Sequence, residues 1–267
     1  MNSSLFPRAV RYYTLWRTLV AQDLAVRYRG TLLGRVWPVL MPLLMLAMYG
    51  FVFGIVFRAR WPGLAEGDHF GYALNLFVGL LVHTLLAESV GQSATLFQSN
   101  SNFVRKVVFP LPVLVAVPLG ASLFHMMLGL GLVAVAAVFW GTGLQWLILA
   151  VPLILLPYLV MLYGLALALS ALGVYVRDLG PILSVAVTML LFTSTVFFPR
   201  SAVPPVLAPI VRVNPISWPV DALRDIILRG QWPSLTDGLH YSLAAVIVLV
   251  CGVLIFRALR PGFADVL

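Results

Sequence analysis

The stretch that decides the fold runs from residue 107 to residue 176: VVFPLPVLVAVPLGASLFHMMLGLGLVAVAAVFWGTGLQWLILAVPLILLPYLVMLYGLALALSALGVYV. Its 70 residues include no Asp, Glu, Lys or Arg. A helix crosses a bilayer core with about 20 apolar residues, so this stretch is long enough for two spans. Gly141, Thr142, Gly143 and Gln145 interrupt it with turn-forming and polar residues. We therefore predict one span over 110–140 and another over 146–175.

Uncharged stretches of similar length occur on both sides of this pair, and they predict further spans at 36–57, 69–92, 179–199 and 238–256. Hydrophobic residues make up 61% of the chain and charged ones 10%, against roughly 25% charged in soluble proteins. The predicted fold class is an all-α integral membrane protein with six transmembrane helices in one domain, residues 1–267. The first span follows six arginines within 35 residues, which favours a permanent span over a cleavable signal peptide. Cys251 is the only cysteine, which excludes a disulfide framework.

The distribution of basic residues predicts the orientation, because Lys and Arg are retained on the cytoplasmic side. Of the 17 basic residues, eleven lie at the two termini and in the connections on the same side, and six lie on the opposite side. Both termini are therefore predicted to be cytoplasmic. Membrane topology and anionic lipid account for the net charge of +8, and no concentrated basic face predicts a nucleic-acid partner.

The segment before the first span, residues 1–35, has helical periodicity. One face carries apolar side chains at a spacing of three and four residues, while the other carries arginines and polar residues. The apolar positions are Tyr12, Leu15, Trp16, Leu19 and Val20. This pattern predicts an interfacial helix with its apolar face in the lipid. It could be a simple anchor and orientation signal, or it could also couple the protein to a partner.

Two segments between spans are neither ordinary loops nor spans. Residues 98–106 (QSNSNFVRK) are polar, and their serines and asparagines favour a helix N-terminus, although any loop between spans must be polar. Residues 200–237 are apolar but broken by six prolines. Such a segment is typical of short helices that re-enter the membrane, and an external cap on the bundle is the alternative.

Several kinds of chemistry find no support in the sequence. A P-loop needs a GK pair, and the only lysine, Lys106, follows Arg105, so the chain is not a P-loop ATPase. Ion-coupled transport would have to use Glu88, His83, His125 or His240, and lone histidines in a bundle are more often packing residues.

Enzymatic sites are equally weak. Glu66 and Asp68, with His69 beside them, form at best a weak metal site, and no metal site is predicted. Asp221 and Asp225 share a helical face, but Arg224 and Arg229 lie close by, so surface ion pairs are the better interpretation. We therefore predict that the chain is not an enzyme.

Four stretches, in their order and spacing, resemble the ABC-2 type export permeases, and specifically the branch that exports surface polysaccharides such as O-antigen, capsule and teichoic acid. They are residues 27–38 (RYRGTLLGRVWP) leading into Pro42, Tyr49, Phe53 and Gly54; Phe109 with Pro110; residues 176–179 (VRDL); and residues 214–217 (NPIS).

The resemblance implies a homodimer that binds two copies of a separate ATP-hydrolysing subunit, in a bacterial inner membrane. No cofactor is then expected on this chain, because ATP and Mg²⁺ belong to the ATPase. Residues 98–106 resemble the coupling helix that docks on the ATPase, and the interface helix would lie beside it. The coupling residues would be Asn100, Ser101, Asn102, Phe103, Arg105 and Lys106, and the interface residues Arg27, Tyr28 and Arg29.

The resemblance also implies that a lipid-linked polysaccharide passes between the protomers along the first and fifth spans, and that residues 200–237 form a pair of periplasmic gate helices. The conduit residues would be Tyr49, Phe53, Thr188, Phe192, Thr195 and Phe198, and the gate residues Asn214 and Pro215. Ordinary helix packing could also explain these aromatic residues. The cargo could instead be a drug or a lipid. A different class, a membrane transferase acting on lipid-linked sugars, would need Asp221, Asp225, Glu66 or Asp68.

Overall fold

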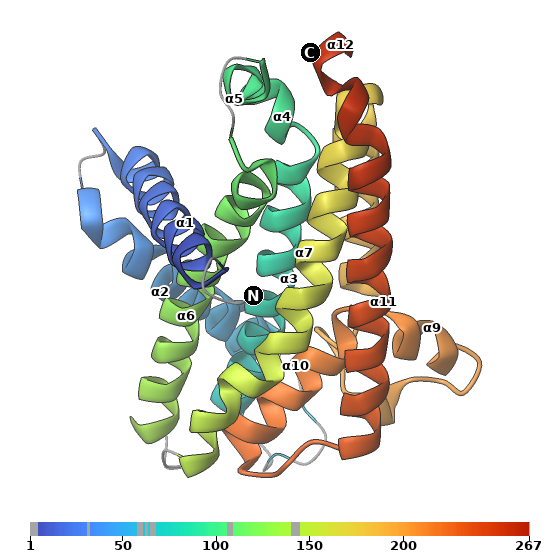
Figure 1. Ribbon diagram of the computed structural model, residues 1–267. Helices are drawn as coiled ribbons and strands as arrows, with labels where there is room; N and C mark the ends of the chain where they lie inside the picture. Colours follow the sequence, from blue (N-terminus) through green and yellow to red (C-terminus); the bar gives the residue numbers. More distant parts are fainter. Residues whose placement is uncertain are drawn as a thin grey trace.

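A computed structural model of the chain describes residues 5–30, 33–57, 61, 64, 68–105, 109–139 and 145–266. Within these ranges every regular element is a helix, and the long helices form one bundle (Figure 1). We refer to the end of the bundle that carries α4, α5 and the C-terminus as the upper end. The end with α9 and α10 is the lower end.

Five helical segments of the described chain are long and apolar enough to cross a membrane: Trp37–Val56, His69–Ser93, Leu111–Phe139, Trp146–Tyr175 and Leu235–Gly262. They correspond to α2 (Trp37–Tyr49) with the π-helical turn η2 (Gly50–Val56), α3 (His69–Ser93), α6 (Leu111–Phe139), the 3₁₀ turn η3 (Trp146–Ala150) with α7 (Val151–Tyr175), and α11 (Leu235–Leu259) with η6 (Arg260–Gly262). A short turn, η1 (Gly34–Val36), precedes α2. The prediction of an all-helical, multi-pass membrane protein is confirmed at this level.

The sixth predicted span, 179–199, is wrong as a continuous helix. Helix α8 covers only Leu179–Phe192, about 21 Å of helix against a bilayer core of about 30 Å. It ends where Leu190 O, the carbonyl that the next turn would use, accepts from the Asn214 amide at 2.8 Å. The Thr193 and Ser194 hydroxyls bond back to the last turn, at Met189 O (2.8 Å) and Leu191 O (2.7 Å). Residues 193–199 then continue without helical structure.

Helix α3 is the centre of the bundle. It carries the largest share of the main core, which α6, α7, α8 and α10 complete. Neighbouring helices approach α3 closely at glycines. At Gly129 of α6, for example, the absence of a side chain leaves room for Leu81 of α3. Helix α2, in contrast, has no buried residue along its length. The first span contacts α6 and α3 through half-buried side chains of α2, and it contacts α3 again through η2, whose Gly54 packs on His69.

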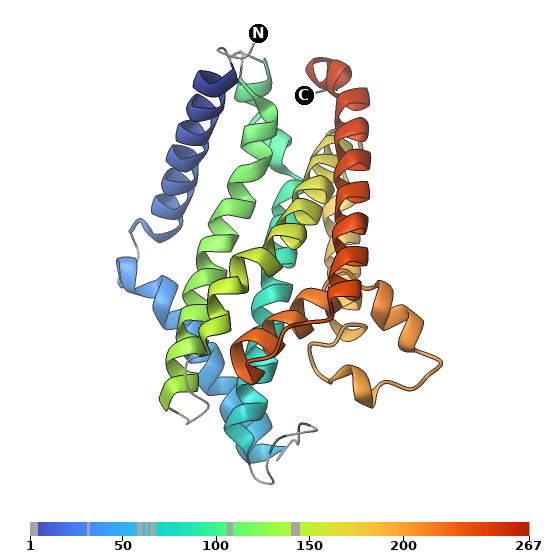
Figure 2. The ribbon, with the colours of Figure 1, turned by 60° about the horizontal axis from the view of Figure 1, so that its bottom comes forward.

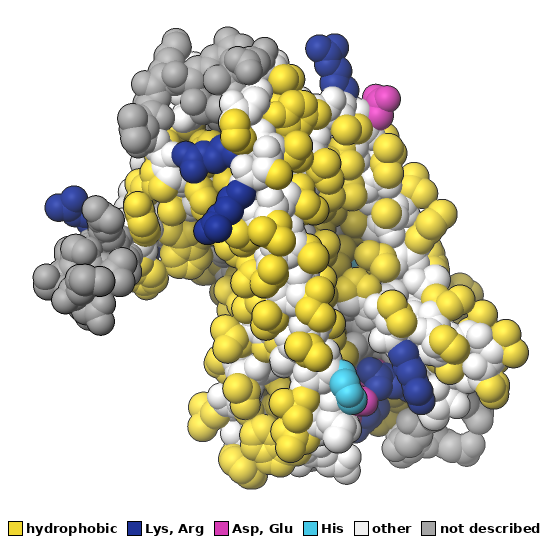
Figure 3. Space-filling view, turned by 45° about the vertical axis from the view of Figure 1, so that its right-hand side comes forward, with side chains coloured by type: hydrophobic (Ala, Val, Ile, Leu, Met, Phe, Trp, Pro, Cys, Tyr) yellow, Lys and Arg dark blue, Asp and Glu magenta, His cyan; other side chains and the backbone are white. Residues whose placement is uncertain are grey.

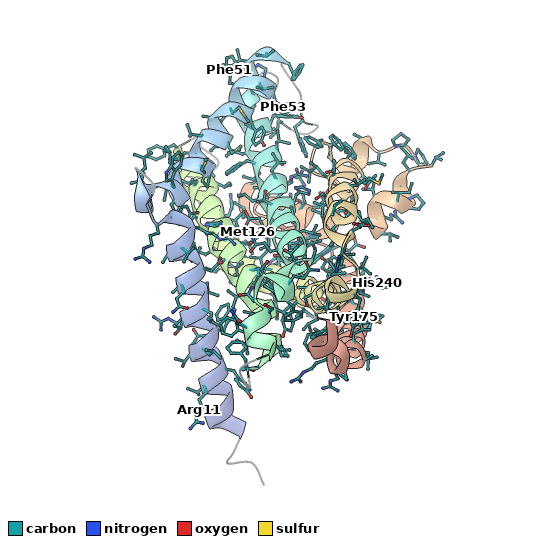
Figure 4. The ribbon with its side chains drawn as sticks, turned by 90° about the horizontal axis from the view of Figure 1, so that it is seen from above. Arg11, Phe51, Phe53, Met126, Tyr175 and His240 are labelled. Carbon is teal, nitrogen blue, oxygen red and sulfur yellow. The ribbon has the colours of Figure 1, made fainter. Side chains whose placement is uncertain are left out.

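Helix α1 (Leu5–Tyr28) lies outside the bundle and packs on α6 (Figure 2). The Trp16 and Val20 side chains pack against Gly120, in the space that a Cβ atom would occupy. The Trp16 indole donates to Ala116 O at 2.9 Å. The apolar face that we predicted to lie in lipid therefore rests partly on protein. Arg11, on the opposite side of α1, points away from the bundle (Figure 4). Gly30, with a φ of 80°, turns the chain after α1 in a conformation that favours glycine.

At the upper end the predicted single helix 98–106 is two short helices, α4 (Leu96–Ser99) and α5 (Ser101–Arg105). Asn100 separates them, and its amide donates to Leu96 O at 2.9 Å, which competes with helix continuation. Leu96 and Phe97 are buried in a second core with Phe256 and Phe263. The last helix, α12 (Phe263–Val266), thereby packs beside α4 and α5.

The lower end holds the proline-broken region. It contains η4 (Arg200–Ala202), α9 (Ala208–Val213), α10 (Ser217–Arg224) and the π-helical turn η5 (Asp225–Arg229), which ends at Gly230 with a φ of 64°. Helix α10 is almost wholly buried against α3 and α7, whereas α9 lies outside and exposes Ile210 and Val213. Only one of the two short helices is thus inserted into the bundle.

The surface agrees with a membrane protein. Figure 3 shows a face covered almost continuously by hydrophobic side chains, with the charged ones in its upper half and in one group near the lower end. Large apolar side chains of α8 and α11 remain exposed, including Met189 and Phe192 on α8 and Leu243 and Leu254 on α11. A soluble protein would not leave apolar faces of this extent in water.

Candidate functional site

The aromatic residues predicted on the first span join a longer chain of rings. The Tyr49 and Phe53 centroids lie 6.4 Å apart, and Phe53 stacks on Tyr72 of α3 at 5.9 Å. Tyr72 meets Trp61 edge-on at 5.6 Å, and the Arg224 guanidinium lies over the Trp61 ring at 4.5 Å. Figure 4 shows Phe53 beside α3, on the bundle side of the first span. Tyr49 and Phe53 are half-buried and contribute to the main core, so both interpretations made from the sequence still apply to them.

The conduit residues predicted on the fifth span do not form one stripe. Thr188 and Phe192 are exposed on α8, and Phe192 stacks on Phe197 at 5.5 Å. Phe198 is half-buried. Thr195 is fully buried and donates to Ser217 O of α10 at 3.2 Å, so its place in the stripe is wrong. The chain turns away from the helical path after Phe192, and this turn carries Thr195 inward.

The residue at the centre of the lower end is Arg224, which is 0% exposed. Its nitrogens donate to three backbone carbonyls: Asn75 O at 2.8 Å, Thr195 O at 2.6 Å and Val196 O at 2.7 Å. Asp221 lies 3.6 Å away and Trp61 covers the guanidinium. We call these six residues the Arg224 cluster. It ties α10 to α3 and to the non-helical end of the α8 segment. The expected surface pair is wrong here, since a buried charge needs such partners.

The predicted gate residues are structural links in the same region. The Asn214 amide donates to Leu190 O at 2.8 Å and to the Thr193 hydroxyl at 3.0 Å, so it caps the end of α8. Its own oxygen accepts from Ile216 N at 3.0 Å. Pro215 offers its carbonyl to the Tyr241 hydroxyl of α11 at 2.8 Å. The NPIS stretch therefore joins α8, α10 and α11.

The predicted interface residues Arg27 and Tyr28 reach into the bundle from the end of α1. Arg27 donates to Gln92 at 3.0 Å and pairs with Asp23 at 2.9 Å and with Glu88 at 3.7 Å. The Tyr28 hydroxyl lies 2.6 Å from His125 Nε2. Burial raises the pKa of the Tyr28 hydroxyl above its usual range. Arg29 is exposed.

Ser122 and a second contact of His125 complete this network. Ser122 of α6 donates to Glu88 at 2.7 Å, and His125 Nδ1 lies 3.8 Å from the same carboxylate. We call the set the α1 cluster; its members are Asp23, Arg27, Tyr28, Glu88, Gln92, Ser122 and His125. It connects α1 with α3 and α6, the two spans that flank α4 and α5.

The predicted coupling residues lie at the tip of the upper end. Asn102 is exposed, whereas Ser101 and Phe103 are half-buried, and Phe103 packs on Phe109 with 4.9 Å between ring centroids. Arg105 ends α5, and Lys106 lies outside the described residues. Gln98 donates to Gly173 O of α7 at 2.7 Å. The tip is thus held to α7 behind it and presents Asn102 outward.

The carboxylates that a transferase would need already have partners. Asp68 accepts from Gly71 N at 2.8 Å and caps α3. Asp225 forms the predicted surface ion pair with Arg229, at 2.5 Å. Asp221 lies 2.7 Å from Arg200. Glu66 falls outside the described residues. Across the part of the chain that the structure describes, no group of three His, Cys, Asp or Glu side chains could hold a metal ion.

Three of the four ion-coupling candidates have partners within the bundle. Glu88 and His125 belong to the α1 cluster, and His83 lies 3.3 Å from Val187 O of α8. His240 is exposed on α11.

Sequence reasoning missed Tyr72, Trp61 and the burial of Arg224. A signal for Arg224 was present: it is a lone arginine in the apolar stretch 216–228, where an unpartnered charge would be costly. Nothing in the sequence distinguishes Tyr72 or Trp61 from the other aromatic residues near span ends.

These features define a class: a multi-pass membrane protein without a P-loop of its own, whose polar segment between two spans projects from one end of the bundle. Residues 14–228 match the ABC-2 type transporter family, and the chain belongs to that family. It is therefore a membrane subunit of the ABC-2 permease type, which normally has no catalytic activity.

Curated relatives match almost the whole chain. It is 25% identical over 257 residues to an O-antigen export system permease protein RfbA of Klebsiella pneumoniae, covering 96% of this chain and 95% of that protein. It is 28% identical over 257 residues to the O-antigen export system permease protein RfbA of Myxococcus xanthus, covering 96% of each.

Proposed function

We propose that this chain is the membrane permease of an ATP-driven exporter that moves a lipid-linked surface polysaccharide of the O-antigen type across a bacterial inner membrane. The observation that carries the proposal is the match of 96% of the chain to O-antigen export permeases. The exposed mixed face of α8, with Thr188 and Phe192, supports it, because aromatic faces and hydroxyls suit sugars.

In this proposal both termini and the upper end are cytoplasmic, which agrees with the excess of basic residues at the termini. Two copies of the chain form the working unit with two ATPase subunits. The exposed apolar faces of α2 and α8 support a second copy as the neighbour of these helices, since α2 has no buried residue within one chain. The polysaccharide would pass between the two copies.

The α4–α5 tip is proposed to dock on the ATPase. It joins α3 and α6, so a push on the tip acts on the core helix of the bundle directly. The α1 cluster binds α1 to the same two spans. Movement of the ATPase pair would therefore move α1, α3 and α6 as one unit and change the separation of the two protomers.

The first test is assembly. The chain is expressed with the ABC-type ATPase encoded beside it and purified in mild detergent. We expect the two proteins to elute as one complex, and we expect ATP hydrolysis by the ATPase to change when the permease is present. Separate elution, together with ATP hydrolysis that ignores the permease, would refute the proposal.

The second test addresses the tip. The double variant Arg105→Glu/Lys106→Glu should weaken complex formation by at least about tenfold, because like charges brought together at an interface cost several kcal/mol, while membrane insertion stays normal. The matched control is Arg177→Glu/Arg257→Glu, which reverses two charges outside the tip and should assemble normally. If both variants assembled equally well, the assignment of the α4–α5 tip as the docking site for the ATPase would be refuted.

The cargo is tested in cells. Deletion of the gene should abolish surface polysaccharide and leave drug tolerance unchanged. The opposite pattern would identify a drug or lipid exporter of the same family and would refute the polysaccharide assignment.

A further inference from the structure

A polar pocket lies at the lower end of the bundle, between η4, α10, η5 and the start of α11. Its volume is about 260 Å³. Side chains that line it include Trp61, Trp218, Arg200, Asp221, Arg229 and Asp237. None of these residues was assigned to the conduit, and none lies on the exposed faces of α2 or α8. The pocket is therefore separate from the path proposed between two protomers.

The charges around the pocket cancel. Arg200 bridges two carboxylates, with Nε 2.7 Å from Asp221 and a terminal nitrogen 3.2 Å from Asp237. Arg229 pairs with Asp225 at 2.5 Å, and Arg224 lies behind Asp221 at 3.6 Å. Two arginines and three aspartates line the pocket, and the buried Arg224 behind them brings the formal charges to balance. A site for a phosphate or a metal ion would carry an excess of one sign, so the balance favours a neutral ligand.

The hydrogen-bonding groups also restrict the ligand. Carboxylates only accept and guanidinium groups only donate, so a ligand that uses both must donate and accept from neighbouring atoms. Hydroxyl groups do this. Trp61 is 4% exposed, and its indole nitrogen is buried without a partner among the described residues, which leaves a donor for a water molecule or for a ligand group that displaces the atoms covering it. Aromatic walls with a few placed polar groups are typical of binding sites, and a volume of about 260 Å³, below the usual ~300–1,000 Å³, suits one small ring.

We propose that this pocket binds one ring of an uncharged saccharide. The choice of a sugar among polyhydroxy compounds rests on the proposed function, which brings a polysaccharide to this end of the protein. Hydroxyls of the ring would bridge Asp237 and Arg229 and accept from Trp61. A unit of the polymer held here would be retained after it leaves the path between the protomers.

The test uses the full-length permease in lipid nanodiscs and four probes, the methyl glycosides of mannose, galactose, glucose and rhamnose, in saturation-transfer-difference NMR. At least one glycoside should give a saturable signal. Asp237→Asn and Trp61→Phe should each weaken its binding by about fivefold, the size of one lost hydrogen bond. The matched control is Trp232→Phe, because Trp232 lies in the connection between η5 and α11, beside the pocket residue Pro233, but is 57% exposed and does not line the pocket. This variant should bind as the wild type does.

Absence of a saturable signal for all four glycosides overturns the proposal, as does equal binding by Asp237→Asn and wild type. Saturable binding of inorganic phosphate, lost in the same variants, also overturns it by identifying an anion site. Asp237 is half-exposed, so its variant is expected to fold even if Trp61→Phe disturbs the Arg224 cluster. The proposed function is scored separately, by surface polysaccharide in cells, so the pocket can fail while export stands.

Discussion

Two arginines, Arg27 and Arg224, organise the two polar regions of the molecule in opposite ways. The Arg27 side chain is 27% exposed and bonds to other side chains, Asp23, Glu88 and Gln92. The Arg224 side chain is 1% exposed and bonds to backbone carbonyls of two different segments. Side-chain partners can change rotamer and be exchanged for water, whereas backbone carbonyls are fixed by the fold. The α1 cluster is therefore suited to rearrangement, and the Arg224 cluster to rigid positioning.

The largest expected effect comes from removing the rigid partner. Arg224→Ala should destabilise the protein by about 3–5 kcal/mol, because it leaves carbonyls and Asp221 buried without partners. Arg224→Lys should restore little of the lost stability. A lysine ammonium group cannot donate to the three carbonyls as the planar guanidinium does, and it cannot stack on Trp61 in the same way. Thermal unfolding in detergent measures both. Arg229→Ala, which loses only an exposed pair, is the control and should cost less than about 1 kcal/mol. Similar losses for Arg224→Ala and Arg229→Ala would contradict the assignment of rigidity.

An intermediate loss of stability is expected when Asn214 is replaced. Asn214→Ala should cost about 1–3 kcal/mol, because Leu190 O and Ile216 N lose their partner at the end of α8. The control is Thr193→Val, which keeps the Asn214–Leu190 bond. Hydrogen exchange at residues 190–196 should rise in Asn214→Ala and change less in Thr193→Val. Unchanged exchange in Asn214→Ala would show that the cap does not hold this segment.

The smallest effect is expected at the α1 cluster. Arg27→Ala, Glu88→Gln and their combination form a double-mutant cycle, with a coupling energy below about 1 kcal/mol for this partly exposed pair at 3.7 Å. The coupling should fall further in high salt. Thermal unfolding at two salt concentrations measures it. A coupling comparable to the loss in Arg224→Ala would erase the distinction between the two regions.

The sequence located the long helices closely and failed where side chains end a helix. The uncharged stretch predicted α6 at 110–140, and it is found at Leu111–Phe139. Hydropathy measures the cost of placing side chains in lipid, and by that measure 179–199 is one span. It contains no information on the distant Asn214, whose amide takes the Leu190 carbonyl where α8 ends at Phe192.

The candidate sites were predictable in part, for a similar reason. The motif at Arg27 and Tyr28 marked the end of α1, but their partners Glu88 and His125 lie in distant spans and depend on how α1 packs. Arg224 was interpreted as a surface residue from its near neighbours Asp221 and Asp225. Its actual ligands are carbonyls of Asn75, Thr195 and Val196, and a carbonyl has no signature in the sequence.

The packing of α1 on α6 has a consequence for biosynthesis. Trp16 and its acceptor at Ala116 are 100 residues apart in the chain. At about 5–20 residues per second, roughly 5–20 s pass between the synthesis of the two residues. During that interval α6 does not yet exist, and the first two spans enter the membrane without α1 in its final place. The amphipathic pattern of α1 therefore serves the nascent chain first, because until α6 is made the lipid surface is the place where its apolar face can rest.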